Sequence, residues 1–140
     1  MILTYTEKMT ADEYNELRLS VDWKSLTQGQ AERGLAHTAF VVAARDGEKI
    51  VGMGRMLFDY GYTAYLGDVI VRPEYQGQGI GTEIVTRLKD RVMEAAEPGD
   101  KIMFILGAAK GKDAFYEKFG FKVRPNDFSG SGMSMWKTKE

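Results

Sequence analysis

The sequence of 140 residues contains no cysteine, one histidine and three prolines, and its charges nearly cancel. The lack of cysteine excludes a disulfide scaffold, a cysteine-ligated zinc site and a thiol nucleophile. The single histidine, His37, excludes any site that needs two histidines, so we expect no metal site. A formal net charge of -1 is not typical of proteins that bind a phosphate backbone, so nucleic acid is not an expected partner.

The sequence also lacks long hydrophobic runs. None approaches the length of a membrane span, and the first ten residues do not have the pattern of a signal peptide. We therefore expect a cytoplasmic protein with no membrane partner. The composition, 44% hydrophobic and 28% charged, is typical of a globular domain, and no linker or repeat divides the chain. A single domain is predicted over residues 1–140.

Hydrophobic periodicity and turn residues predict the order of the secondary-structure elements. Strands are predicted over residues 2–6, 38–44, 49–58, 62–71, 101–106, 121–124 and 133–137. Helices are predicted over residues 10–21, which open with the Thr10–Glu13 capping box, and over residues 25–35, 82–96 and 113–118. This order indicates an α/β (α+β) fold with a mixed, mostly antiparallel sheet of about six to seven strands and helices on both faces.

A glycine-rich loop connects the predicted strand 62–71 to the predicted helix 82–96. Its sequence is Gln76-Gly-Gln-Gly79-Ile-Gly81-Thr82. The first turn of a helix offers backbone N–H groups without intrahelical partners, and glycines allow an anion to approach the backbone. The spacing of the loop does not match the Rossmann fingerprint, and the Gly111-Lys112 pair lacks the remaining residues of a Walker A loop.

Two motifs follow one another along the chain. The first is Gln76-x-x-Gly79-x-Gly81, directly after Val-x-Val-x-Pro, and the second is the segment from Phe115 to Phe121. They resemble the acyl-coenzyme A pyrophosphate loop and the Y-E-K-x-G-F segment of the GNAT acetyltransferase superfamily, in the same order. The resemblance covers essentially the whole chain, and its nearest branch contains the arylalkylamine (serotonin-type) acetyltransferases. It implies a GNAT-like fold and acetyl-CoA as the co-substrate.

The resemblance also implies a set of cofactor contacts. The backbone amides of residues 78–82 would bind the pyrophosphate, and main-chain groups of Val69 and Val71 would pair with the pantetheine arm as an added strand. Ala109 stands where the family often has an asparagine, so a contact there would come from the backbone. The full predicted set is Val69, Ile70, Val71, Gln76, Gly77, Gln78, Gly79, Ile80, Gly81, Thr82, Ala109, Phe115 and Tyr116.

Two side chains are candidates for proton transfer. By the resemblance, Tyr116 would protonate the leaving thiolate as a general acid, although it also fits a core aromatic beside Phe115 and Phe119. Asp68 is the candidate base, because a carboxylate within an apolar strand is costly unless it is paired or functional. Asp68 could equally cap a strand irregularity or pair with a neighbouring arginine.

The acceptor is expected to be a small primary amine, contacted by Asp22, Trp23 and Tyr60. Aromatic rings suit an apolar or aromatic amine, and a carboxylate would attract its ammonium group. Because the chain has no cysteine, an acyl-cysteine route is impossible, and direct attack in a ternary complex is predicted. A non-catalytic CoA-binding regulatory module and a protein N-terminal or lysine acetyltransferase remain alternatives, and a homodimer is left open.

Overall fold

The computed structural model describes residues 2–140, and the chain divides into two compact units, residues 1–104 and 105–140. The strands are β1 (Leu3–Thr6), β2 (Phe40–Asp46), β3 (Lys49–Phe58), β4 (Thr63–Val71) and β5 (Met103–Leu106). The helices are α1 (Ala11–Ser20), α2 (Gln28–Ala36), α3 (Ile80–Ala95) and α4 (Asp113–Glu117), with a short 3-10 helix, η1, over Pro73–Tyr75. The predicted order of elements is confirmed from the first strand to α4.

The strands form one sheet in the order β1-β2-β3-β4-β5, and the first three pairings are antiparallel. Within residues 2–140 the sheet therefore has five strands, so the prediction of six to seven was wrong. The β3–β4 register shifts in the middle: Met53 faces Ile70, but Arg55 faces Gly67. Gly54 thus lies opposite two residues of β4, Asp68 and Val69, which is the arrangement of a β-bulge.

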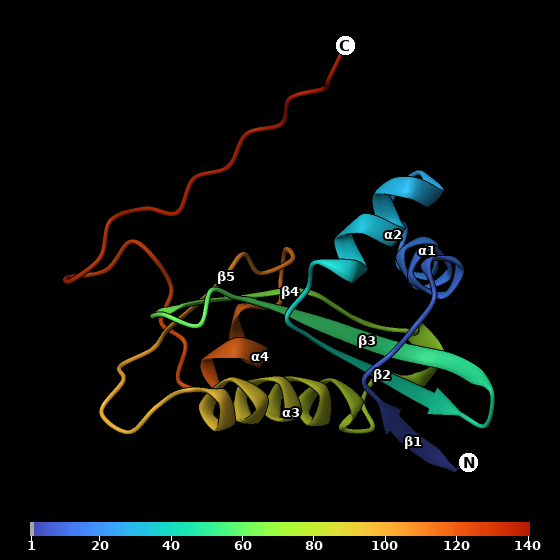
Figure 1. The fold of residues 1–140 in the computed structure, drawn as a ribbon, viewed down its shortest axis with the longest axis horizontal. Helices are drawn as coiled ribbons and strands as arrows, with labels where there is room; N and C mark the ends of the chain where they lie inside the picture. The colour runs from blue at the N-terminus through green and yellow to red at the C-terminus, as the bar shows by residue number, and fades with distance from the viewer. Residues whose placement is uncertain (1) are drawn as a thin grey trace. The chain divides into compact units, whose positions relative to one another are not determined.

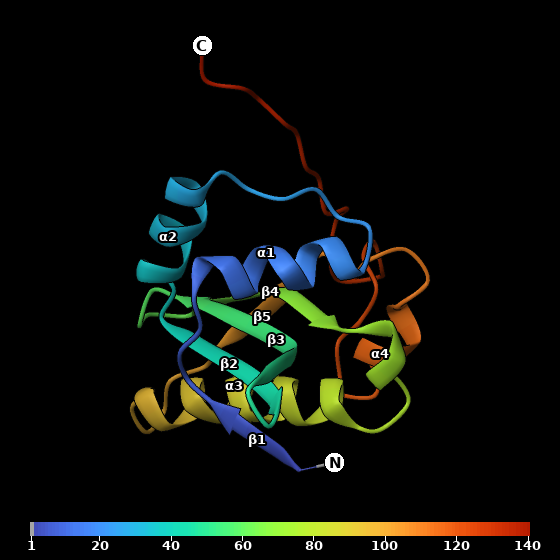
Figure 2. The same cartoon turned by 90° about the vertical axis from the view of Figure 1, so that its right-hand side faces the viewer.

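Helices cover both faces of the sheet in the first unit, as predicted (Figure 1). Helix α1, with α2 beside it, lies on one face and α3 lies on the other, and the turned view in Figure 2 shows the same arrangement. On the α1 face the buried core contains Tyr14, Leu17 and Met53. On the other face α3 buries Ile80, Ile84, Val85, Leu88 and Val92. No helix in residues 2–140 combines the length and the apolar character needed to span a membrane.

Two glycines of β3 bring α3 close to the sheet. A Cβ at Gly54 would lie 2.6 Å from Cγ2 of Ile84 and 2.9 Å from Cδ1 of Leu88. A Cβ at Gly52 would lie 3.1 Å from the carbonyl oxygen of Ile70 and 3.2 Å from Cδ1 of Ile84. Larger residues at either position would push α3 away from β3.

The second predicted helix begins later than expected. It was predicted from Ser25, but α2 begins at Gln28. The side chain of Asn15 accepts a hydrogen bond from the N–H of Leu26 (2.8 Å) and donates one to the carbonyl oxygen of Leu26 (3.0 Å). These two bonds hold the segment before α2 against α1. Thr27 then caps the helix by accepting the N–H of Gln30.

The two last predicted strands, residues 121–124 and 133–137, do not form. The first is followed by a turn in which Asn126 donates its N–H to the carbonyl of Ser129 (3.0 Å). In the second, Met133 and Trp136 are 93% and 95% exposed. An alternating pattern gives a local preference only, and a strand also needs a partner for its backbone and a surface on which to bury one face.

Candidate active site

The glycine-rich loop lies between β4 and α3, where the sequence placed it. Gly77 and Gly79 adopt left-handed backbone conformations, with φ of +78° and +82°, and a Cβ on either would have no neighbour within 4 Å. Gly79 is the N-cap of α3, and no side chain caps this end of the helix. The N–H groups of the first turn are therefore available to an anion. That this anion is the pyrophosphate of acetyl-CoA stays a prediction.

The start of this connection is tied to the β2–β3 hairpin. Tyr75 donates its hydroxyl to Asp46 (2.6 Å), and the Arg72 guanidinium donates through Nε to the carbonyl of Ile50 (2.7 Å). The side chain of Gln76 donates to the carbonyl of Val71 (2.9 Å). These bonds fix the path of the chain from the end of β4 into the loop.

The predicted pantetheine-binding segment, Val69–Val71, directly follows the bulge in β4. Ile70 is buried on the α1 face, while Val69 and Val71 are half-buried. One edge of this segment is paired with β3, where Ile70 faces Met53 and Val71 faces Gly52. The contact of Val69 and Val71 with a pantetheine arm stays a prediction.

Asp68 lies in the bulge, with φ of +50°, and its carboxylate is the centre of a charged cluster. Its Oδ2 accepts hydrogen bonds from the Tyr14 hydroxyl and from Nε of Arg55 (2.6 Å). Its Oδ1 lies 3.6 Å from a terminal nitrogen of Arg18. Asp68 thus both occupies a strand irregularity and pairs with arginines, as one sequence interpretation had it; its role as a base stays a prediction.

The cluster changes the acidity of Tyr14. Burial raises the pKa of Tyr14 to about 12, and the hydrogen bond to the Asp68 carboxylate acts in the same direction. Its hydroxyl therefore stays protonated at neutral pH and donates to Asp68. Tyr14, Arg18 and Arg55 were not predicted as site residues. Tyr14 and Arg18 are one helical turn apart on α1, but their common partner is far away in the sequence.

The three predicted acceptor residues lie in two different places. Trp23 is half-buried against the core, and the Arg18 guanidinium lies 5.6 Å from its ring centre, so Trp23 adjoins the Asp68 cluster. Asp22 is exposed beside it. Tyr60 lies at the turn between β3 and β4, where its ring packs 5.0 Å from that of Phe58.

The remaining predicted residues belong to the second compact unit. Tyr116 lies in α4, and its ring centre is 4.9 Å from that of Phe115 and 6.1 Å from that of Phe121. Ala109 accepts the N–H of Lys112 through its carbonyl (3.0 Å) in the turn before α4. The roles of Tyr116, Phe115 and Ala109 stay predictions.

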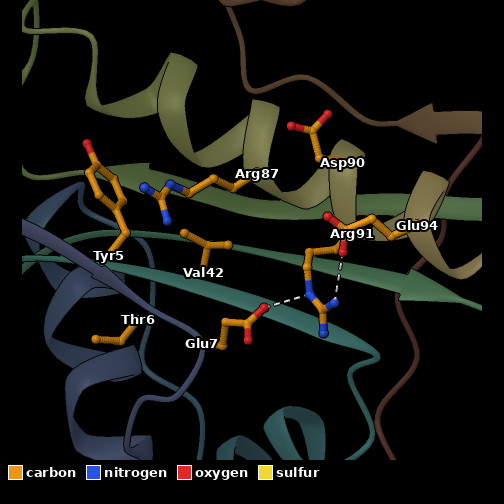
Figure 3. Close-up of a pocket in the computed structure, with 8 residues that line it drawn as sticks. All are labelled: Tyr5, Thr6, Glu7, Val42, Arg87, Asp90, Arg91 and Glu94. Carbon is orange, nitrogen blue, oxygen red and sulfur yellow. Dashed lines mark hydrogen bonds and ion pairs between the residues drawn. The ribbon is translucent and has the colours of Figure 1, made fainter.

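A cavity of about 230 Å³ lies between β1, β2 and α3 (Figure 3). Its two arginines are already paired, Arg87 with Glu83 (2.7 Å) and Arg91 with Glu7 (2.6 Å). The lining residues are Tyr5, Thr6, Glu7, Val42, Arg87, Asp90, Arg91 and Glu94. None of the predicted site residues lines this cavity.

Comparison with known proteins identifies the family of the chain. The sequence model of the acetyltransferase (GNAT) family matches residues 5–121. A protein of unknown function from methicillin-resistant Staphylococcus aureus, described as a probable acetyltransferase, has a similar structure. The TM-score is 0.86 at 28% identity, over 97% of this chain and 100% of that one.

Two curated relatives also match. The chain is 35% identical over 83 residues to GCN5-related N-acetyltransferase 2, chloroplastic, of Arabidopsis thaliana. The matched stretch is 59% of this chain and 31% of the relative. It is 25% identical over 132 residues to an uncharacterized N-acetyltransferase of Porphyra purpurea, 91% of this chain and 74% of the relative. This chain thus spans about a third of the length of the first relative. The family match over residues 5–121 shows that the chain belongs to the GNAT family of N-acetyltransferases, which use acetyl-CoA.

Proposed function

We propose that this protein transfers the acetyl group of acetyl-CoA to a primary amine of a small molecule by direct attack in a ternary complex. The observation that carries the proposal is the junction of β4, the open glycines and the N-terminus of α3, which no side chain caps. Such a junction binds the pyrophosphate of a coenzyme A ester through backbone amides. The absence of cysteine leaves no thiol that could carry the acetyl group.

In this proposal the loop and the strand before it hold the co-substrate. The amides of residues 78–82 bind the pyrophosphate, and the backbone of Val69 and Val71 pairs with the pantetheine arm. Acetyl-CoA supplies a thioester with a good leaving group. The bulge at Asp68 and Val69 interrupts the regular pairing of β4 just before this segment.

Proton transfer is assigned to two residues. Asp68 would accept the proton of the incoming ammonium, directly or through water, because only the neutral amine attacks a thioester. Tyr116 would donate a proton to the leaving thiolate. The bonds of Asp68 to Tyr14 and Arg55 give the carboxylate a second task, which is to hold α1, β3 and β4 together.

The acceptor is proposed to be a small amine of the arylalkylamine type, contacted by Trp23, Asp22 and Tyr60. Trp23 supports this most directly, because its half-buried ring adjoins the cluster around Asp68. A cytoplasmic location and the lack of nucleic-acid and membrane partners belong to the same proposal. The oligomeric state is left open between monomer and homodimer.

A panel of amines tests the proposal. The purified protein is incubated with acetyl-CoA and either arylalkylamines, aliphatic amines or lysine-containing peptides, and thiol release is followed together with the mass of the amine. We expect acetylation of small amines. Binding of CoA without release of thiol from acetyl-CoA in the presence of any acceptor would favour the regulatory module. Acetylation of peptides alone would favour a protein acetyltransferase.

A further inference from the structure

The cluster around Asp68 joins three elements of the first unit and contains more positive than negative charge. Arg18 comes from α1, Arg55 from β3 and Asp68 from the bulge of β4. The three side chains are 16% to 22% exposed, so solvent reaches them while most of their surface is covered. Two guanidinium groups share one carboxylate here, and Tyr14 remains neutral between them.

The hydrogen bonds of the two arginines leave part of their donor capacity for another anion. Nε of Arg18 donates to the carbonyl of Lys24 (2.7 Å), and one terminal nitrogen of Arg55 donates to Thr38 (3.0 Å). Both of these acceptors are neutral. A guanidinium group has five N–H donors and forms its strongest bonds with carboxylates and phosphates. The cluster thus contains two guanidinium groups and one carboxylate.

The cluster lies next to residues that are proposed to contact the co-substrate and the acceptor. Asp68 directly precedes Val69, the first residue of the segment proposed to hold the pantetheine arm, and its side chain is on the α1 face. Trp23 lies against Arg18 and offers an apolar wall beside the charge. We infer that Arg18 and Arg55 bind a carboxylate of the acceptor, so that the preferred substrates are amines that also carry an acid group. This inference rests on the proposed function.

The inference is tested with pairs of acceptors. The two members of a pair differ only in the group at the end of the molecule away from the amine. The series consists of ω-amino carboxylic acids of increasing chain length, each compared with its carboxamide. At the best length we expect the acid to have a kcat/KM about 10- to 100-fold above that of the amide, mainly through KM, because a charge-assisted bond to arginine is lost in the amide. Amine-free carboxylates of that length should compete with the acid acceptor.

Variants assign the effect to this cluster. Arg18→Gln should reduce the ratio of kcat/KM for the acid to kcat/KM for the amide to nearly one, and Arg18→Lys should keep part of the preference for the acid. Arg87→Gln is the matched control, because Arg87 pairs with Glu83 on α3, away from the cluster, and it should keep the full preference.

The possible outcomes separate this inference from the proposed function. Equal kcat/KM for acids and amides at every chain length in the wild-type protein would overturn the carboxylate site and leave the acetyltransferase proposal intact. A preference that survives Arg18→Gln unchanged would also overturn it. Absence of thiol release with every acid and every amide, as well as with the amine panel, would overturn both.

Discussion

The Tyr14–Asp68 hydrogen bond joins the first helix to the bulged strand, and a single hydroxyl supplies it. The charged carboxylate makes the bond stronger than one between neutral groups. Replacing Tyr14 with phenylalanine keeps the buried ring and removes the donor. We expect Tyr14→Phe to lower the free energy of unfolding by about 1–3 kcal/mol at neutral pH, because one partner of Asp68 is lost.

The same variant has an expected pH dependence. The pKa of Tyr14 is raised to about 12 in the folded protein, above its ordinary value of 10.0, so its contribution to stability is full below pH 10.0 and is lost as the pH rises toward 12. Urea unfolding at a series of pH values should show the difference between wild type and Tyr14→Phe shrinking in this range. A difference that stays constant through the alkaline range would contradict this account of Tyr14.

The proposed role of Tyr116 as general acid can be tested by removing its hydroxyl. Tyr116→Phe keeps the ring that packs on Phe115 and Phe121 and removes the hydroxyl. We expect unchanged binding of CoA and a kcat that is about 100- to 10,000-fold lower, as for the loss of a general acid. Tyr62→Phe, at an exposed tyrosine, is the control. Equal rates for wild type and Tyr116→Phe would show that the Tyr116 hydroxyl has no part in the limiting step.

At the scale of elements, the distance between β3 and α3 depends on glycine. Gly54→Ala would place a methyl group 2.6 Å from Ile84 and 2.9 Å from Leu88, so α3 or the strand must shift. We expect a loss of about 1–3 kcal/mol in thermal or urea unfolding. Gly34→Ala in α2 is the control: its methyl group has no neighbour within 4 Å, and it should stabilise the protein by up to about 1 kcal/mol.

The glycine loop allows a similar comparison at the two ends of α3. Gly79 and Gly99 both have positive φ, +82° and +93°, and open space where a side chain would start. Valine at either position should cost about 1–2 kcal/mol of stability. Only Gly79→Val should weaken CoA binding, by about tenfold or more, because the pyrophosphate can no longer approach the amides. Calorimetric titration of CoA would measure this, and equal affinities of the two variants would argue against the loop as the binding site.

Elements with strong local signals were predicted well. The Thr10–Glu13 capping box is present at the start of α1, and the amphipathic pattern placed α3 to within two residues of its start. The two strands predicted after α4 do not form. The sequence there alternates apolar and polar residues, but this pattern does not show whether a neighbouring strand is present to pair with. Within the site, the sequence predicted the loop and Asp68. It did not predict Tyr14 or Arg18, which lie 50 or more residues before their partner, Asp68.

At the scale of the whole molecule, the family match extends from residue 5, in β1, to residue 121, just after α4. It therefore includes parts of both compact units. The first unit holds β1 to β4, the glycine loop and the Asp68 cluster, and the second holds Tyr116. Each unit thus contributes one of the two motifs that first indicated an acetyltransferase. The activity of the full chain, rather than of either part, is therefore the relevant observable.

Direct transfer of the acetyl group from acetyl-CoA to an amine is the step on which the proposed function depends. It is tested by initial rates of thiol release with both substrates varied, using the best amine of the panel, together with the masses of the amine and the protein. We expect intersecting double-reciprocal lines, one acetyl group gained by the amine for each thiol released, and no acetyl group on the protein. Parallel lines with an acetylated protein, or thiol release that does not depend on the amine, would contradict it.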